Sequence, residues 1–464
     1  MKKIFLLTLL IASIFSFSEA KESDYMSKIL KLWSLKTNKT IEFNATKIKD
    51  GYNIFISSKN PYYKDIFSNK PIKLIVDEGP FIFKPRFTLG TAGLVAKGSI
   101  LDILNPKVTK EIQKDLKSKP LYSFEGIVSF SNQLESTLKL DPIIIEDRDF
   151  SFKTSKVIDK SSYDLNTFIG KESIKIDSLE IKPLKEEGFL RFSNILVNVN
   201  ATSKPIDDIM LFVNNSIDIN SLELNATNIK TKQKIHAKFS AKFGANTTRV
   251  DKNYLNVKIN YLIKALDEPT LILTNGIKRS TLIAEFKNLG IKGVVDLIKL
   301  NQKMQEINSE LMEATQKNDD IAIQKAILKS QEIANKIVPI WNETFEANKS
   351  RVILDLELES DKVSYIKLDL VYKAKPLSGN LQSALIALMA QGLEIFDGKF
   401  DIAIDSTLIT SINPLAILGL DMLKSKGFVT FKNGIYYLKG ELKNGKLIIN
   451  GKAYNLKELS QAMF

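Results

Sequence analysis

Side chains that commonly do chemistry are scarce in this 464-residue sequence, which holds one histidine, His236, and no cysteine. A single histidine cannot build a multi-histidine metal site, and it leaves little prospect of a Ser-His-Asp triad. Without cysteine, thiol chemistry and disulfides are excluded. No glycine-rich phosphate loop of the Walker or Rossmann type occurs. We therefore expect no catalytic, cofactor-binding or metal-binding residue and no cofactor, and we interpret His236 as an ordinary residue on the wet face of a strand.

With histidine, thiol and phosphate-loop chemistry set aside, carboxylates are the remaining catalytic groups. A glycosidase needs only two positioned Asp or Glu residues. With 53 acidic residues, the sequence does not select such a pair. The acidic array at Asp355, Glu357 and Glu359 alternates with leucines, as the solvated face of a strand does. A carboxylate-based hydrolase is therefore the third of three functional hypotheses, behind two non-enzymatic ones.

The formal net charge of +13 comes from 66 basic and 53 acidic residues. Only six of the basic residues are arginines, whereas nucleic-acid and phosphate sites favour the bidentate guanidinium group. The lysines are spread among many Asn and Ile residues, as the codon bias of an AT-rich genome produces. We expect no nucleic-acid partner, and a modest attraction to anionic lipid or polysaccharide at a membrane surface is the alternative interpretation of the charge.

The first 20 residues have the parts of a bacterial signal peptide. Lys2-Lys3 is the basic region, an apolar run follows from Ile4 to Phe17, and Ser18-Glu19-Ala20 offers small residues to the peptidase. The apolar run is shorter than the roughly 20 residues that a membrane-spanning helix needs. We predict a signal peptide over residues 1–20, a mature chain that begins at Lys21, and a periplasmic location, with an uncleaved inner-membrane anchor as the alternative.

From about Thr40 to Leu266 the dominant period is two, as is typical of antiparallel strands with one wet face. The segment from Lys234 to Phe243 shows it best, because its apolar residues fall on one face and its lysines on the other. Asp50-Gly51 and Asn275-Gly276 supply turn signals. Residues 21–285 are therefore predicted to form an N-terminal β-rich region.

The apolar spacing changes to three and four between Leu297 and Ala314, which predicts a helix from about Val294 to Lys317. Asn318-Asp319-Asp320 offers turn and N-cap chemistry, a second helix follows, and Pro339 is expected to end it. Residues 286–350 are thus predicted to form an α-helical hairpin.

Strands return in residues 351–464, the predicted C-terminal β-rich region with short helices. Val352–Glu359 and Ile366–Lys373 are predicted to pair as a hairpin with acidic residues on one strand and mainly basic ones on the other. Helices are expected at Leu381–Phe396 and Pro414–Lys424.

Three Asn-Gly pairs, which begin at Asn433, Asn444 and Asn450, predict type I′ turns in a closing meander. A short helix or tail is expected at Leu456–Met463. The predicted fold class is α+β: predominantly extended antiparallel β-sheet with an inserted α-helical hairpin.

Two passages, residues 75–94 and residues 426–454, resemble the YdgA-like family of bacterial envelope proteins, whose members have no agreed biochemical function. The first contains Glu78-Gly79-Pro80, where the family usually has His-Gly-Pro, so the resemblance implies no catalytic histidine here. The second contains Gly427 near its start and Asn450-Gly451 near its end. The resemblance implies an envelope location and adds no reaction.

Three asparagines, Asn44, Asn225 and Asn348, lie in N-x-S/T sequons with Glu two residues before them. This is similar to the extended acceptor of bacterial N-glycosylation. We predict that all three are surface sites, glycosylated where the host has a bacterial oligosaccharyltransferase.

The leading functional expectation is a non-enzymatic periplasmic envelope protein that binds an apolar or amphipathic component, such as a lipid, between sheet and helices. One-sided apolar strands and the lack of a catalytic signature motivate it, although any core needs such strands. The alternative is a structural or interaction protein whose partner is another envelope protein. A contiguous empty apolar groove would favour the first hypothesis, and an exposed apolar patch of roughly several hundred Å² over a filled core would favour the second.

Overall fold

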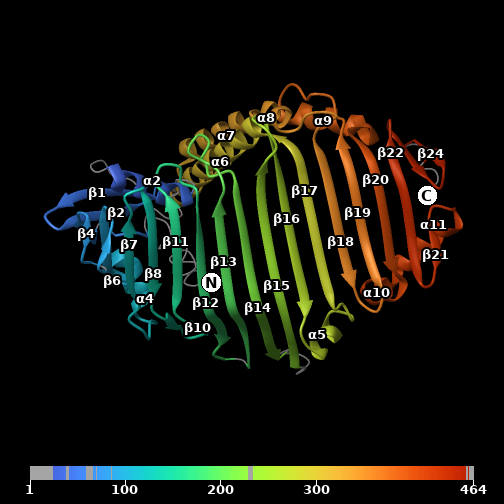
Figure 1. Ribbon diagram of the computed structural model, residues 1–464. Coiled ribbons are helices and arrows are strands. Elements are labelled where there is room, and N and C mark those ends of the chain that lie inside the picture. The colour runs from blue at the N-terminus through green and yellow to red at the C-terminus, as the bar shows by residue number, and fades with distance from the viewer. Residues whose placement is uncertain are drawn as a thin grey trace. The chain divides into compact units, whose positions relative to one another are not determined.

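A computed structural model describes residues 24–37, 41–58, 66–68, 70–84, 86–185, 187–227, 234–455 and 458 (Figure 1). The predicted signal peptide lies outside these residues, as does the predicted C-terminal tail except for Glu458. The chain divides into two compact units, each described by itself below: unit 1 is Met1–His236 with Asn308–Lys317, and unit 2 is Ala237–Ile307 with Asn318–Phe464.

Unit 1 is built on antiparallel strands that follow one another from neighbour to neighbour. Their order is β1 (Glu42–Ile48), β2 (Gly51–Ser57), β3 (Ile72–Glu78), β6 (Ala92–Ser99), β7 (Leu121–Val128), β8 (Gln133–Leu140), β11 (Val157–Asp164), β12 (Gly170–Pro183), β13 (Gly188–Ala201) and β14 (Val213–Thr227). The short strands β9 (Ile144–Glu146) and β10 (Phe150–Thr154) pair with each other, and β10 also pairs with the far end of β12.

The helix α2 (Asp24–Lys36) lies at the centre of the hydrophobic core of unit 1. Its apolar residues recur at helical spacing and are buried, with Met26, Ile29 and Leu30 fully so. Trp33 meets the ring of Phe124 edge to face at 5.8 Å. This helix was not predicted from the sequence. Two shorter helices, α3 (Ile100–Ile103) and α4 (Pro106–Gln113), follow β6.

Unit 2 repeats the antiparallel meander. Its strands, in order, are β15 (Lys234–Arg249, in this unit from Ala237), β16 (Tyr254–Ala265), β17 (Arg279–Gly290), β18 (Arg351–Glu359), β19 (Val363–Tyr372), β20 (Phe396–Asp405), β22 (Ile435–Lys443), β23 (Lys446–Ile449) and β24 (Lys452–Tyr454), with β21 (Thr430–Lys432) beside the start of β22. The predicted α+β class with predominantly antiparallel sheet is confirmed. His236, which was expected on the wet face of a strand, lies at the unit 1 end of β15 and is half-buried.

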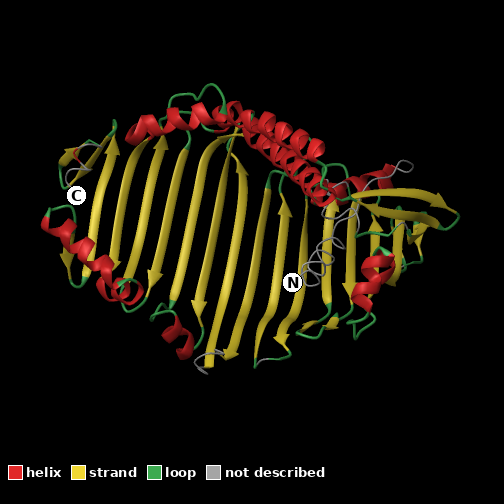
Figure 2. Cartoon of the chain, turned by 180° about the vertical axis from the view of Figure 1, so that it is seen from behind, coloured by secondary structure: helices red, strands yellow, loops and turns green. Residues whose placement is uncertain are grey.

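The helices of unit 2 lie along the ends of its strands. In Figures 1 and 2, which view the protein from opposite sides, α8 (Ile337–Thr344) and α9 (Leu381–Gln391) lie at one end of the strands. At the other end lie α5 (Glu268–Leu273) and α10 (Ser406–Ile412), and α11 (Pro414–Ser425) lies beside the short strand β21. The described helices therefore leave the middle of β16–β20 uncovered on both faces.

The predicted helical segment forms, but its boundaries differ. Helix α6 (Ile291–Lys317) is followed after two residues by α7 (Asp320–Asn335), whose N-cap Asp319 accepts the Ala322 N–H at 3.0 Å. Pro339 does not end the second helix, so that prediction is wrong. It lies in the first turn of α8, where a residue without an N–H loses no helical hydrogen bond.

The C-terminal hairpins form with the predicted turns. Asn433, Asn444 and Asn450 have φ near +50°, and the glycine after each has φ between 71° and 80°, as a type I′ turn requires. Strand β18 pairs with β19 and β22 with β23, as predicted. The predicted helix at Leu381–Phe396 is wrong at its end, because the α-helix stops at Gln391, a 3₁₀ turn spans Gly392–Ile395, and Phe396 begins β20.

Candidate functional site

One face of the unit 2 sheet is apolar across neighbouring strands. Because side chains alternate in a strand, residues in direct register share a face. One such row contains Phe243, Tyr261, Leu282, Leu356, Ile366, Ile402 and Leu438, and the next contains Ala245, Ile259, Ala284, Leu354, Leu368 and Phe400. We call these two rows the apolar face.

The apolar face is not sealed by a second layer of the described structure. Its leucines on β17–β19 are half-buried, and Phe243 and Ile259 are exposed by 40% and 45%. The described helices lie at the strand ends (Figures 1 and 2). Larger exposed apolar patches mark sites where a protein, a membrane or a ligand binds.

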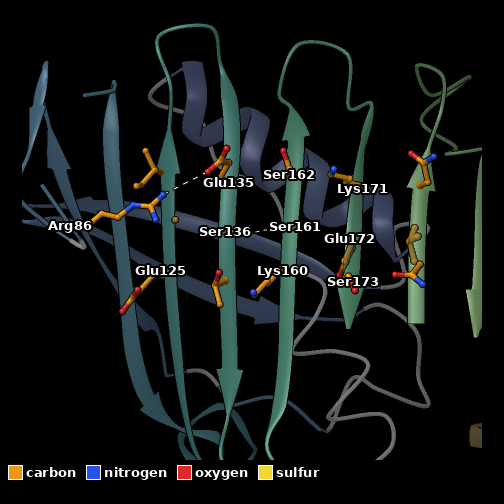
Figure 3. A pocket seen from close by; sticks show the side chains of 16 residues that line it. Arg86, Glu125, Glu135, Ser136, Lys160, Ser161, Ser162, Lys171, Glu172 and Ser173 are labelled. Carbon is orange, nitrogen blue, oxygen red and sulfur yellow. Dashed lines mark hydrogen bonds and ion pairs between the residues drawn. The ribbon is translucent and has the colours of Figure 1, made fainter. Parts of the chain in front are cut away.

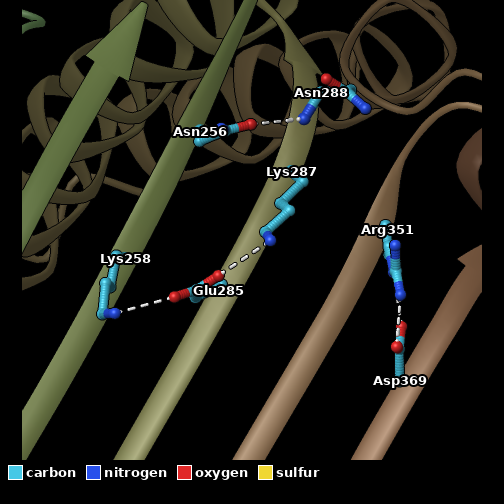
Figure 4. A network of polar contacts seen from close by, with 7 residues as sticks. All are labelled: Asn256, Lys258, Glu285, Lys287, Asn288, Arg351 and Asp369. Carbon is cyan, nitrogen blue, oxygen red and sulfur yellow. Dashed lines mark hydrogen bonds and ion pairs between the residues drawn. The ribbon is translucent and has the colours of Figure 1, made fainter. Parts of the chain in front are cut away.

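The opposite face of the same strands carries ion pairs (Figure 4). Glu285 accepts from Lys258 at 2.8 Å and from Lys287 at 3.2 Å, and the Lys258 hydrogen bond lowers the pKa of Glu285. The Arg351 guanidinium donates two hydrogen bonds to Asp369 and lowers the pKa of that carboxyl.

The predicted charge pairing of the β18–β19 hairpin is also present. Lys367 on β19 lies 3.4 Å from Asp355 and 2.8 Å from Glu357 on β18. The charged side chains of this face favour contact with water. The two faces of the same strands therefore differ in polarity, and only one of them is apolar.

A second candidate is a hollow of about 560 Å³ on the sheet of unit 1, over β7, β8, β11 and β12 (Figure 3). Glu125, Glu135, Lys160 and Lys171 line it among serines and asparagines, and Arg86 reaches Glu135 at 3.7 Å. Mixed charges suit a polar ligand. The carboxylates that line the hollow are Glu125, Glu135 and Glu172, and the hydrolase hypothesis would have to draw its pair from them.

A buried charge cluster lies between α2 and the sheet of unit 1. Lys36 Nζ is 2.7 Å from Glu172 Oε2 and 4.6 Å from the centre of the Tyr163 ring. The Tyr163 hydroxyl donates to the same carboxylate at 3.4 Å. Among the described residues, Asp159 Oδ1 is buried without a hydrogen-bond partner.

The burial of this cluster shifts its proton equilibria. Burial raises the pKa of Asp159 to about 8, and the neighbouring Glu172 adds to the rise while Lys36 opposes it. Burial alone would lower the pKa of Lys36, but Glu172, Tyr163 and Asp159 hold it above its usual range. Asp159 and Glu172 are 7% and 6% exposed, and the ion pair of Glu172 with Lys36 ties α2 to the sheet.

The family-motif residues near the N-terminus lie at a turn. Glu78 ends β3, and its carboxylate accepts the Tyr25 hydroxyl of α2 at 2.6 Å. Gly79 follows with φ 134°, and its N–H donates to the Thr91 carbonyl at 3.1 Å. Pro80 is exposed and leads into a small hairpin.

The C-terminal motif residues are brought together by the fold. Gly427 has φ 78° and follows the end of α11, where the N–H of Phe428 donates back to the Leu423 carbonyl. The Asn450 side chain donates to the Gly427 carbonyl at 2.7 Å, and Gly451 completes the turn after Asn450. These contacts give the three residues structural roles.

The three sequon asparagines are not buried. Asn44, on β1, and Asn348, before β18, are exposed, while Asn225, on β14, is half-buried. The Asn348 side chain accepts from Lys373 at 2.5 Å. Sequence reasoning located these residues, but it missed the buried cluster, because its members come from distant positions and have no shared spacing.

Within the described ranges, no three His, Asp or Glu side chains gather as metal ligands would. The described helices include none whose length and hydropathy would let it cross a membrane. Comparison with known proteins gives no match to a family model, to a curated protein or to a solved structure.

Proposed function

We propose that this is a non-enzymatic periplasmic protein that binds an amphipathic lipid of the cell envelope along the apolar face of unit 2. The observation that carries the proposal is the contiguity of that face, with half-buried leucines on neighbouring strands and no covering helix among the described residues. The apparent signal peptide and the resemblance to envelope proteins support the location.

An acyl chain fits the chemistry of this face better than a polar ligand does. Leu354, Leu356 and Leu368 offer no hydrogen-bonding group, so binding there must come from removing apolar surface from water. Each buried methylene contributes about 0.8 kcal/mol, which makes a long chain an effective ligand. The charged face behind these strands keeps that side of the sheet in water.

Native mass spectrometry of the protein purified from its own envelope tests the proposal. We expect a mass increment that matches a lipid and that disappears after delipidation. Bare protein that also fails to take up added lipid would contradict the proposal.

The two faces of one strand provide a matched pair of variants. Leu354→Gln places an amide on the apolar face, whereas Ile353→Gln makes a similar change one residue earlier on the charged face. Titration with a fluorescent fatty acid should show weaker binding for Leu354→Gln, by about tenfold, and wild-type binding for Ile353→Gln. Equal loss in both variants would place the ligand elsewhere.

A structural or interaction protein is the second candidate, and α11 favours it. Leu415, Leu418 and Met422 form an exposed stripe on this helix, while Leu420 and Leu423 face the local core. Large apolar side chains exposed together on a surface helix suit a covering partner. Recovery of a stoichiometric protein partner and no lipid in the native mass spectrum would favour this function.

A further inference from the structure

A small hairpin in unit 1 displays large apolar side chains to solvent. Strands β4 (Phe81–Ile82) and β5 (Thr88–Leu89) pair with each other through Phe81 with Leu89 and Ile82 with Thr88. Phe81, Phe83, Phe87 and Leu89 are 56%, 68%, 71% and 61% exposed. We call residues 81–89, without the undescribed position 85, the aromatic hairpin.

This exposure does not come from a loosely attached segment. Ile82 is fully buried and anchors the hairpin, so that its neighbours Phe81 and Phe83 point the other way. The Asp77 carboxylate accepts the backbone N–H groups of Phe83 at 2.5 Å and Lys84 at 3.0 Å.

A close backbone contact holds the hairpin against β6. The Lys84 carbonyl lies so near Gly93 that a Cβ on this glycine would come within 1.8 Å of it. The aromatic side chains are therefore held outward by the fold.

The charge of the aromatic hairpin is positive. Lys84 and Arg86 are exposed, and the segment Phe81–Leu89 contains no acidic residue. The ion pair of Arg86 with Glu135, at 3.7 Å between two well-exposed side chains, is weak and leaves the guanidinium available. Aromatic side chains beside basic ones match the interface of an anionic bilayer, where rings enter the headgroup region and cations meet lipid phosphates.

We propose that the aromatic hairpin docks the protein on an anionic lipid bilayer, with Phe83 and Phe87 inserted at the headgroup level. A bilayer accepts projecting rings without a preformed pocket, whereas a protein partner would need one. The proposal is independent of the apolar face of unit 2, since the residues involved belong to unit 1.

Co-sedimentation with vesicles tests the docking. The full mature chain should bind phosphatidylglycerol vesicles more strongly than phosphatidylcholine vesicles, and salt should weaken the binding. Phe83→Ser with Phe87→Ser should lower the partition coefficient by about tenfold or more. Lys84→Gln with Arg86→Gln should lower it by about fivefold for each charge removed, on the anionic vesicles only.

The matched control removes exposed apolar side chains elsewhere. Ile272→Ser with Ile321→Ser changes two residues that are 74% and 83% exposed, and it should bind vesicles as wild type does. Circular dichroism melts check that all variants fold. Equal binding of the Phe83→Ser, Phe87→Ser variant and wild type overturns the proposal, and so does binding that is the same on both lipids.

The absence of native cysteine allows a direct measurement of insertion. A Phe87→Cys variant labelled with an environment-sensitive fluorophore should show a blue-shifted emission on phosphatidylglycerol vesicles and quenching by brominated lipids. The same label at Ile321→Cys should show neither. Identical spectra of the two labelled proteins on vesicles would overturn insertion, even if the protein sediments.

Discussion

Asp159 has an environment far from that of a surface carboxylate. Its pKa rises from the ordinary 3.8 to about 8, chiefly because it is buried, while the cation of Lys36 opposes the rise. The folded protein therefore keeps the Asp159 proton over a pH range in which the unfolded chain has already lost it. Because the folded state holds this proton in that range and the unfolded chain does not, Asp159 contributes a fall in the free energy of unfolding as pH rises from about 4 to about 8.

Asp159→Asn should make the free energy of unfolding depend less on pH. The amide of this variant cannot ionise. Between about pH 4 and pH 8, the free energy of unfolding should therefore no longer fall by the amount, up to about 1.4 kcal/mol per pH unit, that Asp159 contributes. Urea unfolding at pH 5, 6.5 and 8 measures it: wild type should lose stability toward pH 8 and the variant much less. Asp361→Asn, at a fully solvated carboxylate, should follow wild type. Parallel curves for wild type and Asp159→Asn would exclude Asp159 as the source.

Gly445 is the residue on which the last hairpin depends. It has φ 71°, a left-handed conformation that costs a β-branched residue about 1 to 2 kcal/mol. A Cβ would also meet the Glu394 side chain at 2.8 Å. Gly445→Val should therefore lower the urea midpoint. Gly419→Ala, in α11 with open space around the added Cβ, should leave it unchanged or raise it. A wild-type midpoint for Gly445→Val would refute the turn.

At the scale of elements, local chemistry decided what could be predicted. The Asn-Gly turns were predictable because Asn and Gly readily adopt positive φ, and the pairing of β18 with β19 was predictable from their alternating apolar and charged residues. Pro339 was misjudged because a proline that stops one helix and one that begins the next have the same local signature. The buried helix α2 was not predicted, because residues 21–285 were interpreted as a β-rich region.

The attachment of α2 to the sheet should depend on Lys36. Lys36→Met leaves Glu172 buried without its cation, which costs about 3 to 5 kcal/mol. Lys31→Met removes another lysine of the same helix, but its pair with Asp208 is well exposed, so the cost should stay below about 1 kcal/mol.

A double variant separates charge from packing. Lys36→Met with Glu172→Leu removes both partners and should recover much of the lost stability, as for other buried pairs replaced by apolar residues. Urea unfolding measures all three variants. A Lys36→Met variant no less stable than Lys31→Met would show that the buried pair does not hold α2.

At the scale of the whole molecule, the sequence predicts the class of fold, but it does not predict which apolar faces stay exposed. A period of two says which residues share a face, but it does not say whether another layer covers that face. Leu354 and Leu368 have the pattern of core residues, yet they are half-buried on the apolar face. Phe83 and Phe87 are likewise ordinary core residues by type, and only the structure shows that they are exposed.

The position of α2 bears on where the signal peptide is predicted to be cleaved. Cleavage after Ala20 leaves Asp24–Lys36 whole, and the core of unit 1 needs that helix because Met26, Ile29 and Leu30 are fully buried in it. We therefore expect N-terminal sequencing of protein from the native envelope to begin at Lys21. A chain produced without residues 1–20 should unfold at the same urea concentration as the native protein, whereas one that begins at Thr37 should aggregate because its core is open. Recovery of intact Met1 in washed membranes would contradict cleavage and favour an N-terminal anchor.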